Sequence, residues 1–167
     1  DYASFIRYNN ENVKDCLQEK VDIFKPDIIF WSAISSHIHG EGEYVNVQYG
    51  YELISNINTN AKLVTGGLQA TADPKSMLKM MRKLDFIIRG ESELVLSELA
   101  SNISNEIDCT GVKGISYLDE KRNYFENPPQ EIITDLNTIG DYDYSLFEDQ
   151  TFYRPYNGEV VRAVDYE

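Results

Sequence analysis

The chain of 167 residues has the length of one ordinary domain, and its 42% hydrophobic residues are enough to build a core. Its 28 acidic and 15 basic residues give a formal charge of −13, which excludes phosphate backbones and anionic membranes as favourable partners. The two cysteines, Cys16 and Cys109, exclude an all-cysteine metal site and fit a reducing cytosol, and no apolar run reaches the ~18 residues of a membrane span. We therefore expect a cytoplasmic protein that binds neither nucleic acid nor membrane.

The first part of the chain alternates helix and strand patterns. Apolar residues recur at helical spacing from Val13 to Phe24, and Pro26 ends this predicted helix. The continuous apolar run "DIIFWSAI" at residues 27–34 then predicts a buried strand. A second helix is predicted near residues 43–58.

The middle of the chain repeats this alternation. The predicted elements are the strand "KLVTG", a short helix after Pro74, the strand "DFIIRG", and a helix that carries Leu96, Leu99 and Ile103. This alternation predicts parallel β-α-β units with right-handed crossovers. We therefore expect an α/β fold, a doubly wound, mostly parallel, Rossmann-like (flavodoxin-like) sheet in which strands 27–34, 62–66 and 85–89 are neighbours. Trp31, Met77, Met80 and Met81 are predicted core residues.

The alternation stops after Val112. The segment "VKGISYLDEKRNYFEN" predicts two strands joined by a polar turn at residues 119–122, as a hairpin at the sheet edge. Beyond Pro128 no periodicity persists, which predicts an ordered linker that lies against a neighbour. In "FYRPYNGEVVRAVDYE", Asn157-Gly158 separates two strand-like runs and predicts a second, C-terminal hairpin. Because the chain begins without methionine and stops in mid-pattern, we interpret it as a piece of a longer polypeptide.

Three predicted strands end in unusual residues. The first is followed by "SAISSHIHGEGE", the second by the pair Gly66-Gly67, and the third by "RGESE" at residues 89–93. Ligands of doubly wound sheets bind outside the carboxyl ends of the strands, and glycine pairs are kept where the backbone bends sharply or is closely approached. We expect a wide crevice with few side chains, suited to a flat ligand or a long tail. The alternative is that Gly66-Gly67 only makes a tight strand-to-helix turn.

The order of these motifs carries a family resemblance. The segments "PDIIFWSA", "VTGG", "FIIRGESE", "VKGISYLDE", "NPP" and "DLNTIGDYDYSLFE" together resemble the cobalamin-binding domain of B12-type radical S-adenosylmethionine (SAM) enzymes. This family includes the anaerobic Mg-protoporphyrin IX monomethyl ester oxidative cyclase. The resemblance implies a cobalamin-binding-like α/β domain at residues 1–127, without its first strand. It also implies a linker at residues 128–167 that leads into a radical SAM barrel.

The resemblance implies roles for individual residues. Ser32 and Ile34 match a Ser-x-Leu position beside the nucleotide tail of cobalamin, and the Gly66-Gly67 pair matches the glycines against which that tail packs. Arg89 and Glu91 match a third loop, and their expected role is to fix that loop or the domain interface. The candidate cofactor-binding residues are Ser32, Ile34, Ser35, Gly66, Gly67, Leu68, Arg89, Gly90 and Glu91.

The implied function is to position cobalamin for methyl transfer or for oxidative-cyclisation radical chemistry. S-adenosylmethionine and a 4Fe-4S cluster belong to the barrel of the same polypeptide, which is the expected partner, and the parent is expected to be an oxidoreductase or a methyltransferase. The fragment alone is not expected to be catalytic. The alternative is a domain of the same fold that has lost cobalamin and serves as a substrate-shaping or protein-interaction module.

His37 and His39 are the only histidines and lie in the segment "HIHG". With two nearby glutamates they could bind zinc or iron; the alternative is an exposed loop with two solvated imidazoles. The motif Ser35-x-His37-x-x-Gly40 resembles the Asp-x-His-x-x-Gly motif that supplies the lower cobalt ligand in other cobalamin proteins. Here serine replaces the aspartate that orients the imidazole. In those proteins a helix and a strand separate the histidine from the Ser-x-Leu strand, whereas His37 follows Ser32 at the same strand end. We therefore assign no metal ligand and no catalytic residue.

Overall fold

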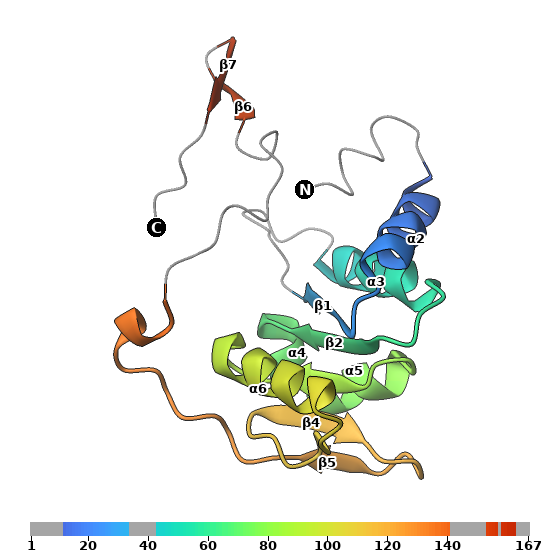
Figure 1. Ribbon diagram of the computed structural model, residues 1–167, viewed down its shortest axis with the longest axis vertical. Helices are drawn as coiled ribbons and strands as arrows, with labels where there is room; N and C mark the ends of the chain where they lie inside the picture. The colour runs from blue at the N-terminus through green and yellow to red at the C-terminus, as the bar shows by residue number, and fades with distance from the viewer. Residues whose placement is uncertain (1–11, 34–42, 141–152, 157, 163–167) are drawn as a thin grey trace.

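The structure of the chain is a computed structural model that describes residues 12–33, 43–140, 153–156 and 158–162 (Figure 1). Its α-helices are α2 (Val13–Phe24), α3 (Glu43–Ser55), α4 (Leu68–Ala72), α5 (Pro74–Met80) and α6 (Glu93–Ser104), followed by the short 3-10 helix η1 (Leu136–Thr138). Its strands are β1 (Ile28–Ser32), β2 (Lys62–Gly66), β3 (Phe86–Ile88), β4 (Ile115–Leu118), β5 (Tyr124–Glu126), β6 (Tyr153–Tyr156) and β7 (Glu159–Arg162).

Local sequence explains where one helix ends and where another begins. Helix α2 stops at Lys25, which takes a left-handed conformation with a φ of 51° directly before Pro26. Helix α5 starts at Pro74, and the side chain of Asp73 accepts a hydrogen bond of 3.1 Å from the backbone N–H of Ser76. Proline at the first helical position after an aspartate cap is a strong start signal.

Five strands form one sheet in the order β1-β2-β3-β4-β5. Strands β1, β2 and β3 are parallel neighbours, and the β4–β5 hairpin continues the sheet with antiparallel pairing (Figure 1). The predicted α/β fold is therefore confirmed, as are the predicted neighbours in its parallel part. The hairpin lies at the sheet edge, as its sequence predicted.

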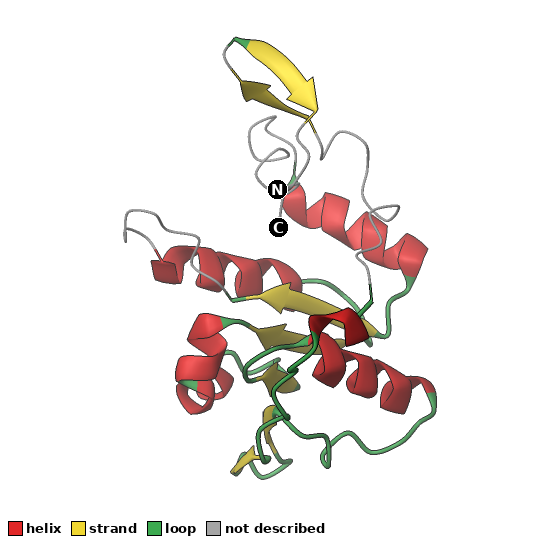
Figure 2. Cartoon of the chain, turned by 90° about the vertical axis from the view of Figure 1, so that its left-hand side faces the viewer, coloured by secondary structure: helices red, strands yellow, loops and turns green. Residues whose placement is uncertain are grey.

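Helices cover both faces of the sheet (Figure 2). Successive residues of a strand point to opposite faces, so β2 and β3 each supply two cores. Leu63 and Ile87 join one buried cluster with residues of α3, α4 and α5, whereas Val64 and Ile88 join a second cluster with Val95 of α6 and its neighbours. Helices α3, α4 and α5 therefore share one face and α6 covers the other, and β2 and β3 are the most completely buried strands.

The structure corrects one predicted core residue, Met80, and exposes one apolar residue of a predicted helix, Phe24. Phe24 is 81% exposed at the end of α2, although its spacing placed it on the apolar face of the helix. Met80 is 69% exposed, whereas Met77 and Met81 are buried as predicted. Trp31 is half-buried in β1 and packs against the first of the two clusters. Helical spacing identifies one face of a helix, but what packs on that face depends on the tertiary structure.

The C-terminal part of the described chain holds the second predicted hairpin. Strands β6 and β7 pair antiparallel, with Tyr156 opposite Glu159, and Gly158 has a φ of 81° in the turn. This hairpin is confirmed, although Asn157 lies outside the described residues. Among the described residues, no helix has the length and apolar character that a membrane crossing requires.

Candidate functional site

The carboxyl ends of the three parallel strands lie side by side. Ser32, the last residue of β1, pairs in register with Gly66, the last residue of β2. Strand β3 lies on the other side of β2 and leads directly into Arg89. We call the residues Ser32–Ala33, Gly66–Leu68 and Arg89–Glu93 the carboxyl edge. It brings together most of the predicted cofactor-binding residues.

Gly66 and Gly67 each have a structural role within the chain. A Cβ atom on Gly66 would lie 3.3 Å from Cε2 of Phe30 and 3.5 Å from the carbonyl oxygen of Ile88, so a larger residue would press on the core. Gly67 has a φ of 104° and a ψ of −178°, a combination that is essentially restricted to glycine. The tight strand-to-helix turn is therefore real.

Backbone hydrogen bonds join the first two strand ends. The N–H of Ala33 donates to the carbonyl of Gly66 at 2.6 Å, and the N–H of Gln69 donates to the carbonyl of Ala33 at 3.3 Å. Ser32 is exposed at this position, and Leu68 is 73% exposed directly after the glycine turn. This part of the carboxyl edge offers backbone, one hydroxyl group and one apolar side chain to the solvent.

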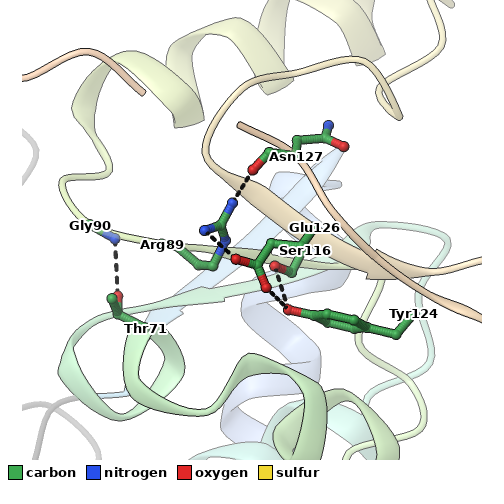
Figure 3. Close-up of polar contacts among 7 residues, drawn as sticks. All are labelled: Thr71, Arg89, Gly90, Ser116, Tyr124, Glu126 and Asn127. Atoms are coloured by element: carbon green, nitrogen blue, oxygen red, sulfur yellow. Dashed lines mark hydrogen bonds and ion pairs between the residues drawn. The ribbon is translucent and has the colours of Figure 1, made fainter. Parts of the chain in front are cut away.

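The third strand end is held by side chains. The Arg89 guanidinium donates through Nη1 to Glu126 Oε1 at 3.0 Å and through Nη2 to the carbonyl of Asn127 (Figure 3). The Arg89 side chain is 13% exposed, and its backbone N–H donates to the carbonyl of Gly114 at 2.8 Å. The guanidinium is therefore directed toward the hairpin, while the neighbouring Glu91 side chain is exposed.

Gly90 connects the loop after β3 to α4, the helix that follows the Gly66-Gly67 turn. It has a φ of 79°, and its N–H donates to Oγ1 of Thr71 in α4 at 3.0 Å (Figure 3). The sequence analysis missed Thr71 and Glu126. The signal for Thr71 was absent because α4 itself was not predicted, and Glu126 is 37 residues away from Arg89.

Tyr124 and Ser116 extend the polar network behind Arg89. The Tyr124 hydroxyl donates to Glu126 Oε2 at 2.6 Å and lies 3.2 Å from Ser116 Oγ (Figure 3). Burial raises the pKa of the Tyr124 hydroxyl above its ordinary value, and the hydrogen bond to the Glu126 carboxylate raises it further. The phenol therefore stays neutral at physiological pH and remains a donor.

Several predicted or weighed positions lie outside the described residues, among them Ile34, Ser35, His37 and His39. Within residues 12–33, 43–140 and the described parts of the C-terminal hairpin, no group of three or more His, Cys, Asp or Glu side chains is placed to hold a metal ion. Two grooves in the described part lie away from the carboxyl edge. One of about 660 Å³ lies between the end of α2 and the start of β2, and one of about 400 Å³ lies beside the β4–β5 hairpin.

No family model matches the chain. An uncharacterized methyltransferase of Pyrococcus horikoshii is 28% identical over 123 residues, which are 74% of this chain and 25% of that protein. The anaerobic magnesium-protoporphyrin IX monomethyl ester cyclase of Rubrivivax gelatinosus is 27% identical over 156 residues, which are 91% of this chain and 27% of that protein. The chain thus spans about a quarter of the length of these curated relatives.

Solved structures share the fold. The radical SAM methyltransferase TsrM of Kitasatospora setae, solved with tryptophan and a SAM analogue, matches with a TM-score of 0.60 at 22% identity, over 75% of this chain and 23% of that one. The chain is similar to B12-dependent radical SAM enzymes, as its motifs predicted. TsrM with cobalamin and a [4Fe-4S] cluster bound also matches with a TM-score of 0.60 at 20% identity, over 78% and 23% of the two chains. The cobalamin-dependent radical SAM enzyme OxsB matches with a TM-score of 0.50 at 20% identity, over 71% and 16%.

Proposed function

We propose that this chain is a cobalamin-binding domain of a radical SAM enzyme. The observation that carries the proposal is the carboxyl edge, where Ser32, Gly66 and the Arg89 loop follow three adjacent parallel strands. Ligands of open α/β sheets bind at this position. The likeness to enzymes solved with cobalamin supports the same conclusion.

The residues of the carboxyl edge fit part of such a ligand. Exposed Ser32, the Gly67 backbone and the largely exposed Leu68 give a surface that a flat, mostly uncharged ring system or its tail can contact closely. A phosphate group fits less well, because the Arg89 guanidinium is engaged by Glu126 and the adjacent Glu91 is exposed. Ser32, Gly67 and Leu68 are therefore the residues we assign to direct contact.

Bound cobalamin would supply a cobalt centre for methyl transfer or radical chemistry, while this chain would orient it and exclude water from one side. We propose that S-adenosylmethionine and a 4Fe-4S cluster are held by a barrel of the same polypeptide. Cys16 and Cys109 are too few to hold such a cluster. The full-length protein should therefore contain a Cys-x-x-x-Cys-x-x-Cys motif outside this sequence.

The second candidate function is a substrate-shaping or protein-interaction module that keeps the fold without cobalamin. The observation in its favour is that Gly66 and Gly67 are both explained by contacts and backbone geometry within the chain. A ligand is then not needed to account for the glycine pair. The two functions differ in whether the chain binds cobalamin at all.

Titration of the chain with hydroxocobalamin, followed by its visible spectrum, tests the proposal. Binding by the wild type is expected, and Ser32→Phe should weaken it at least about tenfold, because a bulky ring at an exposed strand end would occupy ligand space without straining the backbone. Ser97→Phe on an exposed position of α6 is the matched control and should bind like the wild type. Absence of binding by the wild type would favour the second function. Equal binding by Ser32→Phe would place the ligand elsewhere.

A further inference from the structure

We propose that Thr71 and Glu126 are positioning residues for ligand binding. Together they hold the third loop, Arg89–Glu93, from two sides and so place one wall of the carboxyl edge (Figure 3). The inference rests on the proposed function, because it assigns a role in binding to side chains that do not themselves contact the ligand.

Thr71 links two loops of the carboxyl edge. Helix α4 starts directly after the glycine turn, and the N–H of Thr71 donates to the carbonyl of Gly67 at 2.9 Å. The hydroxyl of the same residue accepts from the N–H of Gly90 at 3.0 Å. The Thr71 side chain therefore links the Gly67 turn to Gly90.

Gly90 needs such a contact because packing does not hold it. Gly90 is exposed, and a Cβ atom built on it would meet nothing within 4 Å. The loop is instead held at its first two residues, by the contacts of Arg89 and by the hydrogen bond from the Gly90 N–H. A loop that is held by few contacts moves when one of them is removed.

Glu126 holds Arg89, and its own carboxylate is held in place by a further hydrogen bond. Its Oε1 atom accepts from Arg89, and its Oε2 atom accepts from the Tyr124 hydroxyl at 2.6 Å. That hydroxyl is 3.2 Å from Ser116 Oγ, and Ser116 is fully buried. The Nε atom of Arg89 is buried and has no hydrogen-bond partner among the described residues, so Glu126 and the Asn127 carbonyl determine where the guanidinium lies. The hairpin thus fixes one end of the third loop.

The Thr71→Val variant removes the acceptor and keeps the branched shape, whereas Thr71→Ser keeps the hydroxyl. Thr110→Val is the matched control, because Thr110 also makes a hydroxyl hydrogen bond but makes it to Asp108 in a surface turn. Two readouts are needed: the backbone amide of Gly90 in a nitrogen–proton NMR spectrum, and the affinity for hydroxocobalamin. The amide readout does not depend on any ligand.

We expect Thr71→Val to shift the Gly90 amide, to speed its hydrogen exchange, and to weaken hydroxocobalamin binding about threefold to tenfold. Thr71→Ser should restore both values, and Thr110→Val should change neither. Glu126→Gln should also weaken binding, whereas Glu131→Gln, in an exposed ion pair with Lys113, should not. Unchanged affinity in Thr71→Val and Glu126→Gln, with wild-type binding intact, would overturn the inference alone. No binding by the wild type would overturn the proposed function and, with it, the assigned role.

Discussion

The second loop of the carboxyl edge, Gly66–Leu68, and the third loop, Arg89–Glu93, are built in different ways. The second loop depends on the backbone of two glycines. Gly66 lies where an added Cβ would crowd the Phe30 ring, and Gly67 has a φ of 104°. The third loop depends on side chains, because Arg89 reaches the hairpin and Thr71 accepts from Gly90. The comparison teaches that substitutions in the second loop act on the fold itself, whereas substitutions around the third act on the position of the loop.

The largest expected effect is that of Gly67→Ala. A side chain at a φ of 104° and a ψ of −178° is strained, so we expect the free energy of unfolding to fall by about 1–3 kcal/mol. Urea unfolding measures this change. Gly111→Ala is the control, since Gly111 is exposed, its φ is not in the left-handed region and its added Cβ would meet nothing within 4 Å. Equal stabilities of the two variants would show that the glycine turn is not what the second loop depends on.

A smaller loss is expected from Glu126→Ala. The Arg89 side chain is 13% exposed, so losing its carboxylate partner leaves a largely buried cation with only the Asn127 carbonyl. Because Glu126 is 50% exposed, solvent screens part of this loss, and we expect about 1 kcal/mol in urea unfolding. Glu131→Ala breaks an ion pair whose side chains are 53% and 85% exposed, and it should change stability by less than about 0.5 kcal/mol. Similar losses in both variants would remove the distinction between a structural ion pair and a surface one.

The smallest effect concerns pH and Tyr124. The pKa of its hydroxyl is raised in the folded state, so its contribution to stability is fully present below the ordinary value of 10.0 and is lost as the pH rises through the higher folded value. Relative to Tyr124→Phe, the wild type should be more stable at pH 8 by about 0.5–1 kcal/mol, and this advantage should shrink above pH 10. Urea unfolding at several pH values checks this. A constant difference up to pH 11 would contradict the role of the neutral phenol as a donor to Glu126.

Sequence alone predicted the parallel sheet, both hairpins and the position of the carboxyl edge. The bounds of β2 were predicted correctly because its short apolar run ends at the Gly66-Gly67 pair. Helix α5 was predicted from Pro74, whose fixed φ suits a helix start. These signals are local, so a single sequence contains them.

The remaining features depend on contacts between distant parts of the chain. Helix α4 was missed because its five residues are too few for a helical period. The Arg89–Glu126 pair depends on the antiparallel register of β3, β4 and β5, which motif spacing does not determine. The exposure of Phe24 and Met80 depends on which elements pack beside α2 and α5. The wall of the candidate site that is held by side chains was therefore the part that sequence reasoning could not assemble.

The order of strands in the five-stranded sheet equals their order in the chain. Each new strand therefore joins the edge formed by the strand made directly before it, and no pairing has to wait for a distant segment. Loop closure between such neighbours has a lower entropic cost than closure between distant strands. We therefore expect these pairings to form in chain order, with the β4–β5 hairpin added last. In that order the Arg89 loop gains its Glu126 contact only when the last strand pairs.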